Sequence, residues 1–181
     1  MSEAHVHVDP SNKKVALFIA VLALVLAFAE TLGKGSQTSA LASHIEASDL
    51  WAFFQAKTIR QTVLRTAAEE VEAASASDAQ KKQAAKWKET AQRYQSEPET
   101  GEGREQLTAR AKEAEKKRDR SMAAYHHYEV ASAAVQIAIV LASASIIAEI
   151  VALAWVGAAL GVLGVVFCVI GFFFPTAVHL F

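Results

Sequence analysis

The chain separates into apolar and charged stretches far more sharply than a soluble domain does. Val130 to Phe174 is an almost unbroken run of Ala, Val, Ile, Leu, Phe and Gly, and Glu149 is its only charged residue. A shorter run covers Val15 to Leu32. About 20 apolar residues cross a bilayer as a helix, so the long run has room for two crossings. We therefore predict an all-α integral membrane protein with three transmembrane helices, over 13–33, 130–148 and 151–174.

The first apolar run also has some features of a signal peptide, because Lys13 and Lys14 precede it. It is longer than a typical signal-peptide core, and Glu30-Thr31-Leu32 is a poor cleavage site. We interpret it as a retained transmembrane helix that ends at the breaker sequence 33–36. The polar residues 1–12 are predicted to be disordered. His5 and His7 within them lack a third ligand for a metal ion.

Nearly every charge lies in residues 37–129, which are rich in the helix formers Ala, Glu, Lys, Arg and Gln. We predict an extramembrane, antiparallel, coiled-coil-like helical hairpin over this range, with its tip at the Pro- and Gly-containing turn 96–103. Ser77 or Asp78 is expected to cap a helix that runs to about Gln95. Apolar residues recur at helical spacing and predict a stripe that packs on a close helix neighbour. They are Leu41, Ile45, Ala52, Ala56, Ile59, Val63, Ala67, Val71 and Ala74.

A further helix is predicted from Arg104 without a break into the second crossing, over roughly 40 residues. The outgoing arm from Gln37 is then about twice as long as the arm returning to Tyr128. Either a bend at 74–78 or a first segment lying along the membrane surface would accommodate this difference.

Residues typical of the membrane interface mark the ends of the crossings. Glu149 is expected in the turn between the last two crossings, near 147–151, because a carboxylate at mid-bilayer costs about 2.5–3.5 kcal/mol. Trp155, Tyr125 and Tyr128 are predicted interfacial residues.

Small residues form a stripe at steps of three and four along the third crossing. Such stripes let helix backbones approach closely in lipid. The stripe is compatible both with packing within the chain and with packing between subunits. The stripe consists of Ala154, Gly157, Gly161, Gly164, Cys168 and Gly171.

An aromatic and basic cluster follows the first crossing, and it comprises Trp51, Phe53, Phe54, Lys57 and Arg60. It suits either a membrane-surface anchor or the packed base of the hairpin, and we favour the packed base.

The stretch Ala47-Ser48-Asp49-Leu50-Trp51-Ala52-Phe53-Phe54-Gln55-Ala56-Lys57-Thr58-Ile59-Arg60 resembles the signature of a bacterial membrane family catalogued as domain of unknown function 4337. The likeness continues at Gln136-Ile137-Ala138-Ile139, which opens a membrane hairpin that is Gly-rich at its end. The resemblance implies an architecture and no catalytic residues. Family members often carry basic residues between the last two crossings, where this chain has Glu149, so the resemblance gives no orientation.

The search for chemistry is largely negative. The net charge of −1 and the near balance of both signs do not favour nucleic acid. The sequence has no phosphate-binding glycine loop, nucleophile motif or spaced metal-ligand set, so we predict no catalytic residue, cofactor or metal. The adjacent His126 and His127 point about 100° apart on a helix.

We therefore expect a non-enzymatic, self-assembling protein of the bacterial inner membrane. Its partners would be the lipid bilayer, further copies of itself and a larger membrane complex, for which it would act as a scaffold or accessory subunit. The alternative is a pore or transport component with Glu149, Glu30 or Gln136 facing the pathway. Lys13 and Lys14 favour a cytoplasmic N-terminus and an external hairpin, whereas counting the basic residues of 112–120 reverses the orientation.

Overall fold

Four α-helices make up most of the protein in the computed structural model, which describes residues 10–75 and 77–178. They are α1 (Pro10–Ala73), α2 (Asp78–Gln95), α3 (Arg104–Ala148) and α4 (Val151–Phe173), and no strand occurs in the described residues. α1, α3 and α4 are each long and apolar enough to cross a membrane. The predicted all-α class and the three helices able to span a bilayer are therefore confirmed.

The helices contribute to two units. One comprises Met1–Ala40 and Asp119–Phe181, and the other Leu41–Arg118. We call them the apolar unit and the charged unit. The predicted disorder of 1–12 falls mainly on residues 1–9, which lie outside the described residues. For residues 10–12 the prediction is wrong, since α1 begins at Pro10, and proline suits the first helical position.

The predicted helix break at 33–36 is also wrong, because α1 continues through it. A glycine inside a helix costs about 1 kcal/mol, which is too little to end a helix that propagates from both sides. Gly33 also has a packing role. A Cβ atom on it would lie 3.3 Å from the Cβ of Tyr128, so α1 and α3 approach closely there.

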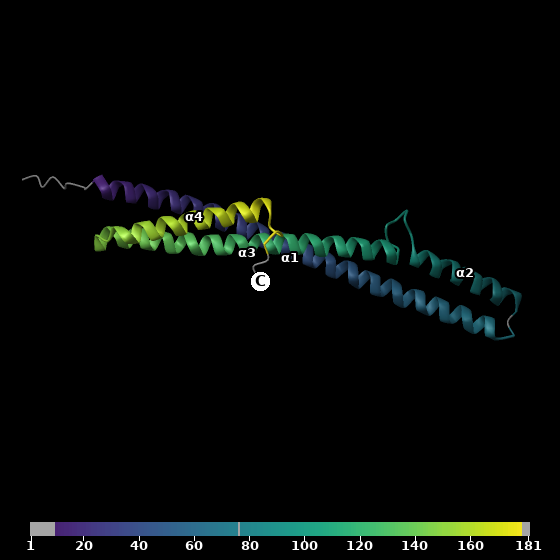
Figure 1. The fold of residues 1–181 in the computed structure, drawn as a ribbon. Helices are drawn as coiled ribbons and strands as arrows, with labels where there is room; N and C mark the ends of the chain where they lie inside the picture. The colour runs from purple at the N-terminus through teal and green to yellow at the C-terminus, as the bar shows by residue number, and fades with distance from the viewer. Residues whose placement is uncertain (1–9, 76, 179–181) are drawn as a thin grey trace, which may run out of the picture. The chain divides into compact units, whose positions relative to one another are not determined.

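In the charged unit, α2 and the first part of α3 lie one after the other along α1 (Figure 1). The contacts show this order, because the partner's residue number rises as the α1 residue number falls. Both segments therefore run antiparallel to α1. The contacts join Glu72 to Lys88, Gln61 to Ala91, Lys57 to Glu97, and Trp51 to Glu115.

The hairpin therefore reverses at 74–77 and not at 96–103, which corrects the predicted tip. Ser77 caps α2 with a capping box that includes Gln80, as expected for a helix running to Gln95. The segment 96–103 is a loop between α2 and α3, with Gly101 at φ 70°. A Cβ on Gly103 would clash with the Glu97 backbone nitrogen and the Gln106 side chain, so this loop folds tightly onto itself.

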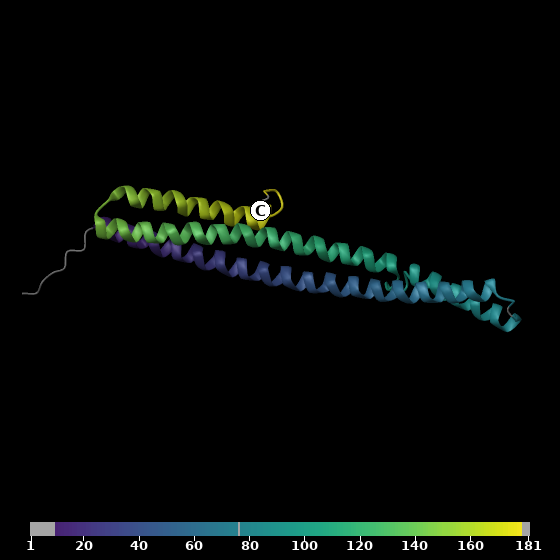
Figure 2. The same ribbon diagram turned by 90° about the horizontal axis from the view of Figure 1, so that it is seen from below.

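In the apolar unit, α4 packs alongside α1 and α3 (Figures 1 and 2). Leu22, Val135 and Ala138 form the buried core of this packing. Tyr128 lies against both Gly33 of α1 and Gly171 of α4. These contacts place Gly33, Tyr128 and Gly171 at one level along the three helices.

A two-residue turn joins α3 to α4 where the sequence predicts it. α3 ends at Ala148 and α4 begins at Val151. Glu149 adopts φ 54°, the left-handed region that a non-glycine residue enters only at a cost. Its side chain is exposed, as expected for a turn residue.

Candidate functional site

Lys57 is the most deeply buried charged residue of the charged unit, with 6% of its side chain exposed. Its Nζ lies 3.4 Å from Glu97 Oε2 and 3.6 Å from Glu102 Oε2, both on the 96–103 loop. The rings of Phe53 and Tyr94 lie 5.4 and 4.9 Å from the same Nζ. A buried cation needs such compensation, so Lys57 ties the loop to α1.

A second polar group joins the three helix segments beside this loop. Gln61 donates to the Ala91 carbonyl oxygen over 2.8 Å. Arg104 donates from Nη1 to Gln61 Oε1 over 2.5 Å and to Gln95 Oε1 over 3.0 Å. Its guanidinium also lies 4.9 Å from the Phe54 ring centre. We call Lys57, Gln61 and Arg104 with these partners the polar clamp, and its contacts join α1 to α2, α3 and the 96–103 loop.

The aromatic cluster packs inside the charged unit. Trp51, Phe53 and Phe54 lie against the buried core of Ala47, Leu50, Leu107, Ala111 and Ala114. Trp51 donates from Nε1 to Glu115 over 2.9 Å, and its ring meets that of Phe54 edge to face at 5.5 Å. These contacts match the packed alternative for the cluster, whereas Arg60 is exposed.

The apolar stripe predicted for the outgoing arm does not form the contact within the chain. Leu41, Ile45, Ile59 and Val63 are between 53% and 65% exposed. α1 instead packs through the opposite side of the helix, about 180° away. The residues of α1 buried there are Ser43, Ala47, Leu50, Lys57, Gln61 and Ala68. The charged unit therefore leaves an exposed apolar stripe on α1.

The glycine stripe of α4 packs within the apolar unit. Gly157, Gly161, Gly164 and Gly171 are buried and Ala154 is half-buried. A Cβ on Gly161 would lie 2.6 Å from Leu22 Cδ2, and one on Gly164 would lie 2.5 Å from Val135 Cγ2. Of the two readings of the stripe, the structure shows packing within the chain.

Polar residues gather in a groove between α1 and α3 of the apolar unit. Gln136 Nε2 donates to Glu30 Oε1 over 3.3 Å, and both side chains are exposed. The Tyr125 hydroxyl donates to Glu129 over 3.4 Å. The groove has a volume of about 450 Å³ and is also lined by Lys34, Gln37 and Ser132. It is a polar strip on helices that are otherwise apolar.

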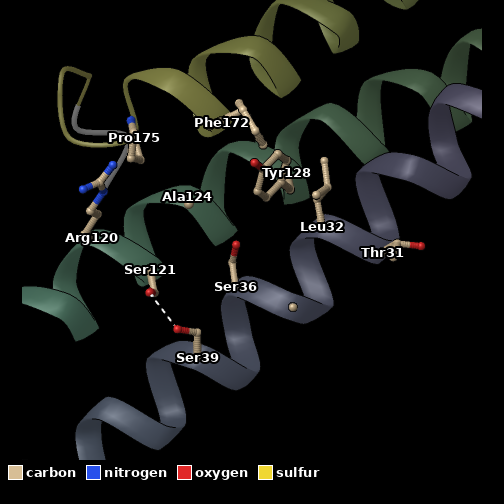
Figure 3. Close-up of a pocket in the computed structure, with 12 residues that line it drawn as sticks. Thr31, Leu32, Ser36, Ser39, Arg120, Ser121, Ala124, Tyr128, Phe172 and Pro175 are labelled. Atoms are coloured by element: carbon tan, nitrogen blue, oxygen red, sulfur yellow. Dashed lines mark hydrogen bonds between the residues drawn. The ribbon is translucent and has the colours of Figure 1, made fainter.

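A separate pocket of about 360 Å³ lies between α1, α3 and the end of α4 (Figure 3). Ser36 and Ser39 line it from α1, and Arg120 and Ser121 line it from α3. Ser121 donates to the Ser39 hydroxyl over 3.2 Å. The rest of the lining is mainly apolar, and it includes Leu32, Ala124, Tyr128, Phe172 and Pro175.

The residues predicted at the membrane interface have different surroundings. Trp155 is 74% exposed near the start of α4, and Glu149 is exposed in the adjacent turn. Tyr125 is half-buried, whereas Tyr128 is buried between α1 and α4. Tyr128 thus acts as a packing residue near the end of α4.

His127 is fully buried beside Tyr128, and its Nε2 lies 3.2 Å from the Pro175 carbonyl oxygen. Because a carbonyl oxygen only accepts, Nε2 carries the proton of this hydrogen bond. The imidazole ring stacks on Phe167 at 6.1 Å. His127 thereby fixes the turn after α4. Within residues 10–75 and 77–178, no group of three His, Cys, Asp or Glu side chains is placed to hold a metal ion.

Sequence reasoning missed the polar clamp, the buried His127 and the pocket at Arg120. Lys57 stood out only as part of an aromatic stretch, because its partners on the 96–103 loop come about 40 residues later. A weak signal existed for the pocket. Ser36 and Ser39 follow the first apolar run and Ser121 precedes the second, but their pairing depends on the register of α1 against α3.

These observations define a class: an all-α protein with three helices able to cross a membrane and a charged helical unit between the first and second. The chain belongs to the family described as Domain of unknown function (DUF4337), whose family model matches residues 11–174. No curated protein and no solved structure matches the chain. The resemblance seen at 47–60 is thus confirmed, and the family brings no activity with it.

Proposed function

We propose that this protein is a non-enzymatic, self-assembling membrane protein that acts as a scaffold or accessory subunit of a larger membrane assembly. The exposed apolar stripe of α1 carries the proposal. Leu41, Ile45, Ile59 and Val63 belong to the charged unit, where the neighbouring surface is polar. An aligned row of large apolar side chains in water typically marks a protein interface.

The occupant that best fits the stripe is a second copy of the chain. Ile45, Ala52 and Ile59 recur at intervals of seven residues, the repeat of a coiled-coil contact. Copies inserted in one membrane in the same orientation present α1 in parallel. Each stripe residue then meets its own counterpart about a two-fold axis along the membrane normal.

The level shared by Gly33, Tyr128 and Gly171 supports a proposal for the membrane position. We infer that hydrocarbon extends from this level to that of Lys13, Ala148 and Val151. All three helices then span about 30 Å over roughly 20 residues, which is the thickness of a bilayer core. Lys13 and Glu149 come to the opposite boundary, where charge is tolerated. A bacterial inner membrane with a cytoplasmic N-terminus and an external charged unit remains our proposal for location.

Cysteine cross-linking tests the parallel contact. In a Cys168→Ser background, Ala52→Cys places a thiol on the stripe, whereas Ala42→Cys places one on exposed surface about 80° around α1. In lipid nanodiscs or membranes we expect Ala52→Cys to form a covalent dimer and Ala42→Cys to remain mainly uncross-linked.

A charged substitution within the stripe provides a second test of the parallel contact. Ile59→Glu should reduce the oligomer measured by native mass spectrometry, while the helical circular dichroism stays unchanged because the side chain is exposed in the single chain. A monomeric unmodified protein in lipid, or equal cross-linking of both cysteine variants, would reject the assembly.

A pore or transport component is the second candidate, and the polar groove favours it. In the proposed membrane position, Gln136 lies about 12 Å inside the boundary at Tyr128, counted along α3. Glu30 lies about 4.5 Å inside the boundary at Gly33, counted along α1. Polar groups at such depth need protein or water beside them. Ion flux into liposomes that disappears with Gln136→Leu, but persists with the exposed control Gln55→Leu, would favour the pore over the scaffold.

A further inference from the structure

The pocket between α1, α3 and the end of α4 has a polar end and an apolar end. Gly33, Tyr128 and Gly171 mark one level along these helices. Leu32 and Phe172 lie at that level, next to the apolar runs. Ser36 and Ser39 follow Gly33 on the side that leads away from the apolar run, and Arg120 and Ser121 precede Tyr128 on the same side. Arg120 and the three serine hydroxyls of the pocket therefore lie on one side of this level, together with Ala124 and Pro175. On the other side, the Thr31 hydroxyl donates to the Ala27 carbonyl oxygen.

Arg120 supplies a positive charge at the polar end. It makes no ion pair with any residue that the structure describes, and its side chain extends from α3 toward Pro175 in Figure 3. Guanidinium groups bind phosphate oxygens through paired, charge-assisted hydrogen bonds. The pocket thus offers an anion a cation beside hydroxyl groups.

The serine hydroxyls can complete the coordination of such an anion. Ser39 accepts from Ser121, so the Ser39 hydroxyl proton remains available to donate. The Ser36 hydroxyl makes no hydrogen bond to any described residue, and Figure 3 shows it directed between the two helices. Gly35 also lines the pocket, and a Cβ on it would meet nothing within 4 Å. The space beside Gly35 is therefore open.

We propose that this pocket binds the phosphate group of a glycerophospholipid. Arg120 and the serine hydroxyls would bind the phosphate oxygens, while Leu32 and Phe172 would contact the start of the acyl chains. A phospholipid has the same order of polarity along the bilayer normal as the pocket, with its phosphate outside and its chains inside. This site is independent of the proposed assembly, because its residues lie in the apolar unit and the apolar stripe lies in the charged unit.

Native mass spectrometry of the full chain in detergent, with dioleoyl phosphatidylglycerol as the added lipid, tests the site. We expect one tightly held lipid per chain. Arg120→Gln should weaken its retention about ten-fold, since a charge-assisted hydrogen-bond pair is lost. Arg110→Gln is the matched control, because Arg110 is also exposed on α3 but lies in the charged unit, outside the pocket.

A second variant separates binding from folding. Gly35→Leu places a side chain in open space and removes a helix-interior glycine, so thermal stability should be kept or raised while the lipid is lost. Glycerol 3-phosphate, added without lipid, distinguishes a lipid site from a general phosphate site. Equal lipid retention in all variants, or binding of glycerol 3-phosphate as tight as that of the lipid, would overturn the proposal.

Discussion

At the scale of single residues, burial decides how much each charge matters. Lys57 pairs with Glu97 of the 96–103 loop and Lys88 pairs with Glu72 of α1, but only Lys57 is buried. A buried charge that loses its partner destabilises a protein strongly, whereas an exposed pair contributes little. The same distinction applies to His127, whose single hydrogen bond to Pro175 lies in a fully buried place.

Lys57→Ala should lower the free energy of unfolding by about 2 kcal/mol, because Glu97 would lose a charge-assisted hydrogen bond and keep only its ion pair with the exposed Arg93. Lys88→Ala is the control, and its exposed pair with Glu72 should be worth less than about 1 kcal/mol. Denaturant unfolding followed by circular dichroism in one detergent measures both. Losses of similar size would show that the polar clamp does not stabilise the charged unit.

At the scale of helices, the order of segments along α1 explains the unequal arms that the sequence presents. The outgoing arm is matched by α2 and the start of α3 together, because both lie antiparallel to it in succession. Neither a bend of the outgoing helix at 74–78 nor a segment on the membrane surface is needed to balance the lengths. The loop 96–103 connects α2 to α3, and the ion pairs of Lys57 hold this loop against α1.

The close packing of the glycine stripe predicts how substitutions in α4 change thermal stability. Gly161→Leu should lower the thermal stability of the protein, because the new side chain would occupy the position of Leu22. Leu22→Ala in the same chain should restore part of the loss by making room. Val162→Leu, on the exposed side of α4, is the control and should have little effect. An unchanged melting temperature with Gly161→Leu would contradict the packing of α4 on α1.

At the scale of the whole molecule, the three apolar helices require a nonpolar solvent. Large side chains of α4 such as Val162, Phe172 and Phe173 are 60% exposed or more in the single chain. Water would not stabilise such a surface, whereas hydrocarbon does. We therefore expect the protein to stay with membrane vesicles during extraction with alkaline carbonate and to dissolve only with detergent. Release into the aqueous fraction, with a soluble membrane-associated protein as the control, would contradict a membrane-spanning protein.

The sequence predicts some of the candidate sites and not others, and the difference depends on how local each signal is. The turn at Glu149 and the cap at Ser77 depend on neighbouring residues, and their signals were readable in the chain. The stripe at Ile45 and Ile59 was recognised by its period, but a period does not say which face of an Ala-rich helix turns inward. The opposite face also offers Ala47 and other small residues, and the polar clamp selects that face.

The amino-acid sequence alone determined the all-α class, the three helices able to cross a membrane and the extent of α2. These follow from local helix propensity, from apolar length and from capping, which act over a few turns. Only the tertiary structure decided the place of the hairpin reversal, the partners of the glycine stripe and the composition of the Arg120 pocket. Each of these depends on the register between helices distant in sequence, which is set by packing and buried polar contacts that no local pattern records.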